Sequence, residues 1–244
     1  MRTRMWINGS AILVSSVFSA AGLMTLAPGC AGTHQSQPGP EARKAAEPAR
    51  IYDGYAGYAR TVTTESAEAQ RWFNQGIQFL YGFNHDEAIR SFHKAAEIDP
   101  ECAMAWWGVA YAHGMHINNP VMGEEQSRLA FEAAQKALAR LDGETAVERA
   151  LVEAVSRRYA WPVPEDRSAL DEAYASAMGD VYRAFPGDAD VGALYAESMM
   201  DLQPWDLWTH DGEPKKRALE IVEVLEKAMA IAPDHPGANH FYIH

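Results

Sequence analysis

Two pairs of histidines have the spacing that binding of a metal ion requires. His240 and His244 are four residues apart in a segment that we expect to be helical, so both imidazoles lie on one face of that helix. His113 and His116 are three residues apart at the expected end of another helix. Paired imidazoles bind one divalent ion, such as zinc, copper or iron, when a carboxylate or a third histidine completes the ligand set. The alternative is that these histidines are buried between helices and hydrogen-bonded there.

The remaining motifs favour a non-catalytic role. Zinc peptidases place Glu directly after the first His of such a pair, and Phe241 stands there instead. The sequence contains no phosphate-binding loop, no Gly-x-Ser-x-Gly motif and no Cys-x-x-Cys-His haem site. We therefore assign no catalytic residue, and we expect His85 to be an ordinary turn residue.

Tryptophan, histidine and asparagine gather in three segments, 113–123, 161–166 and 203–214, that we expect to be loops. Aromatic side chains exposed in loops are unfavourable unless they bind a partner or pack against one another. Two interpretations therefore stay open, a binding rim for a partner or loops that fold onto each other. The rim would consist of His113, His116, Asn118, Asn119, Trp161, Trp205, Asp206, Trp208, His210 and Asp211.

The elements that would position these loops are clearest in residues 69–100, which have the pattern of two helices joined by a turn. Large and small residues recur at i, i+4 and i+7 on both expected helices, and a proline ends the segment. Gly76 and Ala88 allow the two helices to approach closely, while aromatic side chains fill the space around that contact. The residues that define the pattern are Trp72, Gly76, Phe79, Ala88, Phe92, Ala95 and Pro100.

This segment resembles a tetratricopeptide repeat, with a departure at Gln75, where Leu is usual. The resemblance implies an all-α fold in which helix–turn–helix units stack into a right-handed α-solenoid. In such a stack the enlarged loops, which all join the first helix of a unit to its second, share one edge. The expected divisions are an irregular lead-in at 51–65 and a repeat domain at 66–244, with units at 69–100, 101–142, 145–186, 188–233 and an incomplete unit at 235–244.

Local signals indicate where several helices begin. Ser66 is expected to cap the first helix, and Asn84 with Glu87 to form a capping box for the second. Thr145 and Glu148 have the same spacing at the start of the third unit, where Thr is a usual capping residue.

The last unit contains only the start of a first helix. An isolated helix that short is marginal, and repeat arrays normally end in a polar capping helix. We therefore expect the array to continue beyond His244.

In the second and third units, the second helices are expected at 124–141 and 168–185.

The amino terminus has the pattern of an export signal. Residues 1–10 are positively charged, and residues 11–27 carry no charge over a stretch that is short for a membrane span. The residues before Cys30 resemble a bacterial lipobox, so 1–29 is interpreted as a signal peptide and Cys30 as the residue that carries lipid. Plain secretion after cleavage near Ser19 and an uncleaved anchor are the two alternatives.

Residues 30–50 are expected to form a flexible linker. They are rich in Pro, Ala and Gln and contain no large apolar residue, so they cannot bury enough surface to fold. A linker after a lipid-bearing cysteine indicates an exported protein, either periplasmic or anchored to the membrane as a lipoprotein. The second cysteine, Cys102, is expected to be a small core residue.

The net charge limits the kind of partner, and a second resemblance concerns the class of protein. The formal net charge of −12 argues against a nucleic-acid partner, which would need a basic surface. The sequences GFNHDEA at 82–88 and NHFYIH at 239–244 resemble a subgroup of bacterial exported repeat proteins, which implies no particular activity.

We therefore expect a non-catalytic scaffold for a peptide or protein partner in the bacterial cell envelope. The chain would touch the membrane only through an N-terminal lipid anchor. The alternative is a metal-binding protein, or a component of a metal-dependent enzyme, that uses the clustered histidines.

Overall fold

The computed structural model describes residues 48–54 and 57–244. The expected signal peptide, the lipidation site at Cys30 and most of the linker lie outside the described residues. The described part is all-α, with nine helices and no strand. The helices are α2 (Ala67–Tyr81), α3 (His85–Ile98), α4 (Ala103–Ala112), α5 (Glu124–Leu138), α6 (Ala146–Ser156), α7 (Ser168–Ala184), α8 (Ala189–Met200), α9 (Ala218–Ile231) and α10 (Pro236–Ile243).

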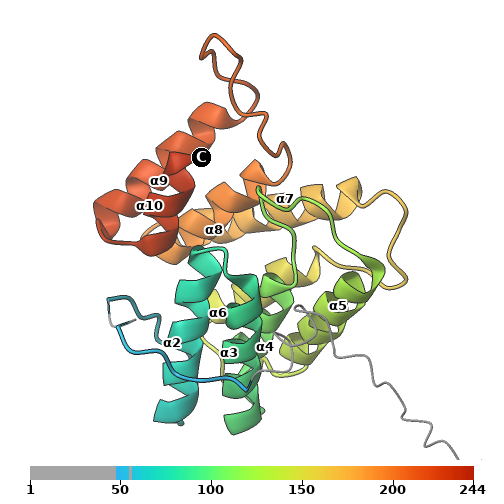
Figure 1. The fold of residues 1–244 in the computed structure, drawn as a ribbon, viewed down its shortest axis with the longest axis vertical. Coiled ribbons are helices and arrows are strands. Elements are labelled where there is room, and N and C mark those ends of the chain that lie inside the picture. The colour runs from blue at the N-terminus through green and yellow to red at the C-terminus, as the bar shows by residue number, and fades with distance from the viewer. Residues whose placement is uncertain (1–47, 55–56) are drawn as a thin grey trace, which may run out of the picture. The chain divides into compact units, whose positions relative to one another are not determined.

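Each helix packs against the one that follows it along the chain (Figure 1). The second helices of the predicted units begin where the sequence indicates, at Glu124 and Ser168. The end of α5 at Leu138 is three residues earlier than expected, because Ala139 and Arg140 close a tighter final turn through bonds to Gln135 and Ala137. No helix in residues 48–54 and 57–244 is both long and apolar enough to cross a membrane.

Two of the three predicted helix caps are confirmed. The Ser66 side chain accepts a hydrogen bond from the backbone N–H of Ala69 at 3.2 Å. Thr145 and Glu148 form a complete capping box. The capping box at Asn84 is wrong, since the Asn84 side chain makes no cap hydrogen bond and its ψ of 67° is not the extended value that aims a cap residue at the helix.

Phe92 is clamped between two glycines, which explains how α2, α3 and α4 come so close. A Cβ atom added at Gly76 on α2 would lie 2.7 Å from the Phe92 ring, and one added at Gly108 on α4 would lie 2.4 Å from it. Both distances are shorter than any relaxed contact, so only glycine fits at either position. The predicted close approach at Gly76 is therefore confirmed, and Trp72, Phe79, Ala88 and Ala95 are buried around it.

The last helix of the described chain packs against the first (Figure 1). Helix α10 contacts α2 as well as α8 and α9. At this junction the buried Asp190 accepts hydrogen bonds from the Tyr58 and Tyr81 hydroxyls. Arg60 lies 2.7 Å from the same carboxylate, and the Nε2 atom of His235 lies 3.2 Å from it. The lead-in segment, α2, α8 and the start of α10 are thus joined at one buried carboxylate.

Candidate functional site

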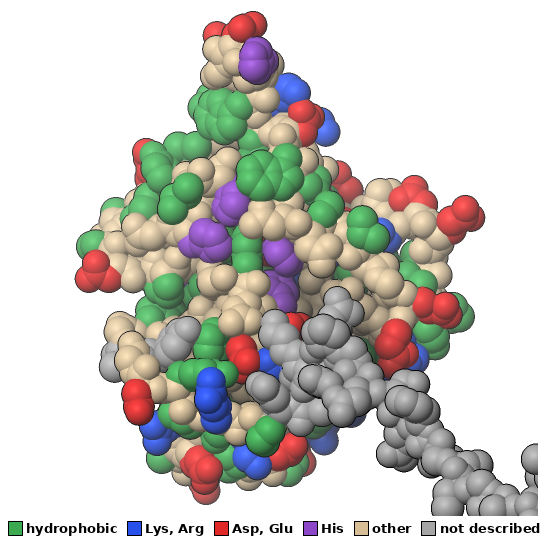
Figure 2. All heavy atoms as spheres, viewed as in Figure 1, with side chains coloured by type: hydrophobic (Ala, Val, Ile, Leu, Met, Phe, Trp, Pro, Cys, Tyr) green, Lys and Arg blue, Asp and Glu red, His purple; other side chains and the backbone are tan. Residues whose placement is uncertain are grey.

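Four histidines from distant parts of the chain meet around one aromatic ring. Figure 2 shows histidine side chains gathered in the middle of one face of the described chain. The Phe83 ring lies at their centre, with ring-centroid distances of 4.3 Å to His116 and 4.6 Å to His240. His244 lies 5.2 Å from His240, and His85 lies 4.3 Å from His116. We call these four histidines and Phe83 the histidine cluster.

Three segments of the fold supply the histidine cluster. His85 is the first residue of α3, His116 lies in the α4–α5 loop, and His240 lies on α10. Phe83 sits in the α2–α3 turn with a φ of 54°, a left-handed value that costs a non-glycine residue about 1 kcal/mol or more. Its contacts with the surrounding rings offset this cost and hold the turn in place.

Two of the imidazoles have a fixed orientation. The Nδ1 atom of His85 lies 2.8 Å from the carbonyl oxygen of Ala112, and the Nδ1 atom of His240 lies 2.6 Å from that of Tyr81. A carbonyl oxygen only accepts, so each Nδ1 carries the proton and donates it. In the neutral ring the lone pair is then on Nε2.

The other two imidazoles have buried nitrogens without a partner. Nδ1 of His116 and Nε2 of His244 make no hydrogen bond to any described residue. Buried polar atoms are nearly always paired with protein, water or an ion, so each of these nitrogens calls for a physical explanation.

Burial favours the neutral form of three of the four clustered histidines. Burial, and then the neighbouring His116, lower the pKa of His85 to about 3. Burial, and then the Arg158 guanidinium, lower the pKa of His116 to about 4. Burial and His240 also lower the pKa of His244. A neutral imidazole offers a lone pair to a metal ion or to a hydrogen-bond donor, which a charged one does not.

Sequence spacing paired His113 with His116, but these two histidines have different neighbours in the structure. His113 has His93 and Glu125 as its electrostatic neighbours, whereas His116 has Arg158, His240 and His244. The sequence patterns did not indicate His85 or Phe83 as site residues. Both belong to the turn of the first predicted unit, and they could have been found by extending to this short turn the expectation that the enlarged loops share one edge.

No three His, Cys, Asp or Glu side chains within the described ranges are arranged so as to hold a metal ion together. The imidazoles of the histidine cluster are instead interleaved with the Phe83 ring.

An apolar pocket of about 330 Å³ opens beside the histidine cluster. Trp208 lies at its edge and Trp205 lies close by, with its ring 5.2 Å from that of His244. Trp205 is 66% exposed and Trp208 is 39% exposed. The residues that line the pocket include Met200, Leu207, Trp208, Ile221, Leu225, Phe241 and His244.

The remaining residues of the expected rim are spread over other loops. Trp161, Asn118, Asn119 and His210 are exposed. Figure 1 shows the α6–α7 loop, which carries Trp161, projecting from a different side of the domain than the α8–α9 loop. Only Trp205 and Trp208 are therefore placed beside the apolar pocket.

A buried arginine joins the three long loops beneath this surface. The Nη2 atom of Arg158 donates to the carbonyl oxygen of Met115 at 2.7 Å and to Asp201 at 2.6 Å. Its guanidinium lies 4.8 Å from the centre of the Tyr174 ring. Arg158 lies in the α6–α7 loop, Met115 in the α4–α5 loop and Asp201 in the α8–α9 loop. The guanidinium group of Arg158 therefore connects all three loops.

Two buried carboxyl groups lie near this arginine, and one of them, Asp201, is ion-paired with it. Glu197 accepts a hydrogen bond from the Tyr111 hydroxyl. Burial, and then the charge of Asp201, raise the pKa of Glu197 well above its ordinary value, which favours the protonated form of this carboxyl group. Burial raises the pKa of Asp201 to about 7 although Arg158 opposes the shift.

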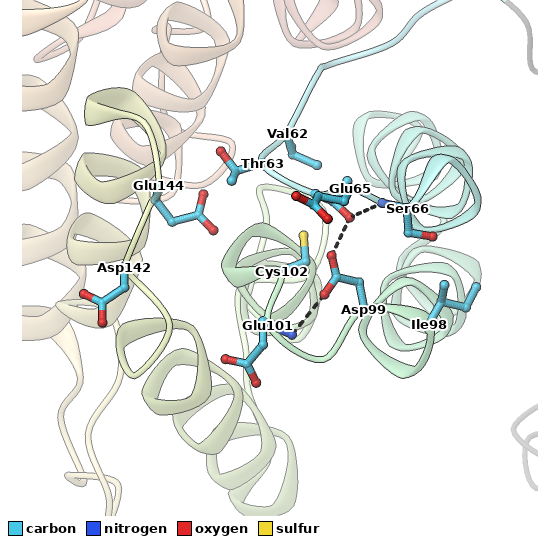
Figure 3. Close-up of a pocket in the computed structure, with 11 residues that line it drawn as sticks. Val62, Thr63, Glu65, Ser66, Ile98, Asp99, Glu101, Cys102, Asp142 and Glu144 are labelled. Atoms are coloured by element: carbon cyan, nitrogen blue, oxygen red, sulfur yellow. Dashed lines mark hydrogen bonds between the residues drawn. The ribbon is translucent and has the colours of Figure 1, made fainter.

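An acidic pocket of about 730 Å³ lies where the lead-in segment meets the starts of α2 and α4 (Figure 3). Five carboxylate residues line it around Cys102, and none of its lining residues is basic; they are Glu65, Asp99, Glu101, Asp142 and Glu144. Burial, and then the nearby Glu148, raise the pKa of Glu144 to about 7. Cys102 is buried, as expected from the sequence, and burial raises the pKa of its thiol to about 12. The thiol is therefore un-ionised and inert at neutral pH.

No protein-family model matches the chain. A comparison with curated proteins also gives no match.

Proposed function

We propose that this chain is a non-catalytic scaffold of tetratricopeptide-like repeats that binds a peptide or protein partner in the bacterial cell envelope. The sequential pairing of the helices is consistent with a repeat array. The glycines that clamp Phe92 support the motif interpretation of the first unit, because close helix approach at small residues is what that motif requires.

The observation that carries the proposal is the exposed Trp205 beside an apolar pocket. A tryptophan that leaves 66% of its surface in water is unfavourable unless a partner covers it. Tryptophan is also the residue type most often found to dominate binding energy at interfaces. The adjacent pocket of about 330 Å³ is at the small end of ligand-site sizes and suits an apolar side chain of a peptide.

The location in the cell envelope depends on the sequence alone. We propose that Cys30 carries lipid and that the helical domain is held at a membrane surface by the linker. Mass spectrometry of the amino terminus of the mature protein tests this, and an unmodified Cys30 would contradict it.

The binding proposal is tested by panning a random-peptide phage library against the full-length chain. We expect enriched peptides to share an apolar or aromatic anchor residue. Because the anchor would lose its main contact, Trp205→Ala and Trp208→Ala should each weaken the binding of a synthetic consensus peptide at least about tenfold, which is about 1.4 kcal/mol.

Trp161→Ala is the matched control, since Trp161 is 38% exposed, much like Trp208, but lies in a different loop. Equal losses in all three variants would contradict a site at the α8–α9 loop. Failure to enrich any consensus peptide would contradict the peptide-binding proposal itself.

A further inference from the structure

The apolar pocket beside the histidine cluster has a carboxylate on its α9–α10 side. Helices α9 and α10 run side by side there (Figure 1). Val222 and Leu225 of α9 line the pocket together with Phe241 and Tyr242 of α10. No Lys, Arg, Asp or Glu of the described chain lines it, so the pocket itself matches an apolar side chain.

Tyr242 connects the wall of this pocket to the carboxylate of Glu226. The Tyr242 hydroxyl donates to Oε1 of Glu226, with 3.0 Å between the two oxygens. This hydrogen bond holds the carboxylate near the pocket but uses only one of its roughly four lone-pair positions. Tyr242 is 46% exposed, and Glu226 is exposed as well. Both groups are therefore accessible to a molecule that occupies the pocket.

The charge of Glu226 is not compensated as the charges of its neighbours are. Glu223 on the same helix is paired with Lys227 at 2.7 Å, and Asp206 in the α8–α9 loop is paired with Lys215. In the part of the chain that the structure describes, Glu226 has the neutral Tyr242 hydroxyl as its partner. The whole chain has a formal net charge of −12, which attracts cationic molecules from a distance. These charges favour a ligand that carries a positive charge close to an apolar group.

Arginine fits the pair formed by Tyr242 and Glu226 better than lysine does. Its planar guanidinium donates to a carboxylate through two parallel N–H groups and also stacks on an aromatic ring, whereas an ammonium group is a compact point charge. In an extended peptide, residues up to two positions from an anchor lie within about 7 Å of it. A long arginine side chain spans such a distance, so it reaches Glu226 from a neighbour of the residue that fills the pocket.

We propose that the pocket and the pair formed by Tyr242 and Glu226 bind a peptide with an apolar or aromatic anchor and an arginine within two positions of it. This inference rests on the proposed function and adds the chemistry of a second recognised residue. The anchor fills the pocket beside Trp208, while the guanidinium lies on the Tyr242 ring and pairs with Glu226. The partner is therefore a segment that is both apolar and basic.

The test measures the binding of short labelled peptides to the full-length chain by fluorescence anisotropy. Each Gly- and Ser-rich peptide carries a central Leu, Phe or Trp, with either arginine or its neutral isostere citrulline within two positions of that anchor. The arginine peptide should bind about three- to tenfold more tightly at low salt, as expected of an exposed ion pair with a cation–π contact. This advantage should shrink as the salt concentration rises, because salt screens exposed charges.

Glu226→Gln should lower the affinity for the arginine peptide to that for the citrulline peptide, since the amide keeps the hydrogen bond from Tyr242 but carries no charge. Glu223→Gln is the matched control, because Glu223 is an exposed carboxylate of the same helix that is already paired with Lys227, and the arginine advantage should persist. Equal binding of the two peptides by the wild-type chain, with both weakened by Trp208→Ala, would overturn this inference and leave the proposed function standing. Absence of binding by every anchored peptide would contradict both.

Discussion

The buried carboxyl group of Glu197 is the clearest case of chemistry set by a single residue's surroundings. Its only direct partner among the described residues is the Tyr111 hydroxyl, and the paired charges of Arg158 and Asp201 lie nearby. Burial raises its pKa well above the ordinary value, so the folded chain holds a proton that the unfolded chain releases. This carboxyl group therefore makes the fold less stable as the pH rises above about 4, the ordinary pKa of Glu.

We expect Glu197→Gln to remove this dependence. The amide carbonyl still accepts from Tyr111 but has no proton to lose, so the melting temperature of the variant relative to wild type should increase from pH 4 to pH 8. Melting curves at several pH values measure the difference directly. Comparison with wild type cancels the opposite contribution of His85 and His116, whose pKa values are lowered. A constant difference across this range would mean that Glu197 is not protonated in the fold.

Among the elements, the junction of α2, α3 and α4 tolerates the least change. The Phe92 ring separates the two outer helices, and glycine faces it on both sides. Such a contact transmits any increase in volume directly to the backbone, because tightly packed interiors have little room to relax.

We expect Gly108→Ala to destabilise the domain by about 1–3 kcal/mol, since the added methyl would lie 2.4 Å from the Phe92 ring. Urea unfolding followed by circular dichroism measures the loss. Gly187→Ala is the control, because a Cβ atom there meets nothing within 4 Å. If the two variants are equally stable, the clamp on Phe92 is looser than the structure indicates.

The sequence predicted correctly those features of the helices that are determined by side chains only a few residues away. The helix starts at Ser66 and Thr145 follow from side chains three residues away, and they were predicted correctly. Asn84 has the same spacing to Glu87, but the turn that ends α2 fixes its backbone, and sequence spacing does not reveal that. The close approach at Gly76 was predictable, whereas its counterpart at Gly108 depends on how α4 packs against α3.

The candidate site was predicted less well, because its contacts join distant segments. His240 and His244 form a pair through their spacing, which a sequence shows. The contact of His85 with His116 depends on how the α4–α5 loop folds back, and the approach of α10 to α2 depends on the path of the whole chain. Neither leaves a pattern in the sequence.

At the scale of the described domain, the Asp190 carboxylate holds the first and last helices together. It is buried, and although burial raises its pKa, hydrogen bonding to His235 and the charge of Arg60 lower that pKa below the ordinary range. Its contribution to stability is therefore present above about pH 4, the ordinary pKa of Asp, and is lost as the pH falls toward the lowered folded value.

We expect Asp190→Asn to cost about 3 kcal/mol at neutral pH, because it leaves the buried Arg60 with one fewer charge partner. The gap in melting temperature between variant and wild type should narrow as the pH falls below about 4. Asp180→Asn provides a control, since Asp180 is an exposed carboxylate paired only with Arg183 among the described residues. A gap that does not change with pH would show that Asp190 is not the ionised group of this junction.

Tyr81 belongs to both the Asp190 junction and the histidine cluster. Its hydroxyl donates to Asp190, its backbone carbonyl accepts from Nδ1 of His240, and its ring fills the space that a side chain at Gly237 would need. The same residue thus fixes the imidazole of His240 through its backbone and the buried carboxylate of Asp190 through its hydroxyl. A disturbance of the packing between α2 and α10 at Tyr81 is therefore felt at both places at once.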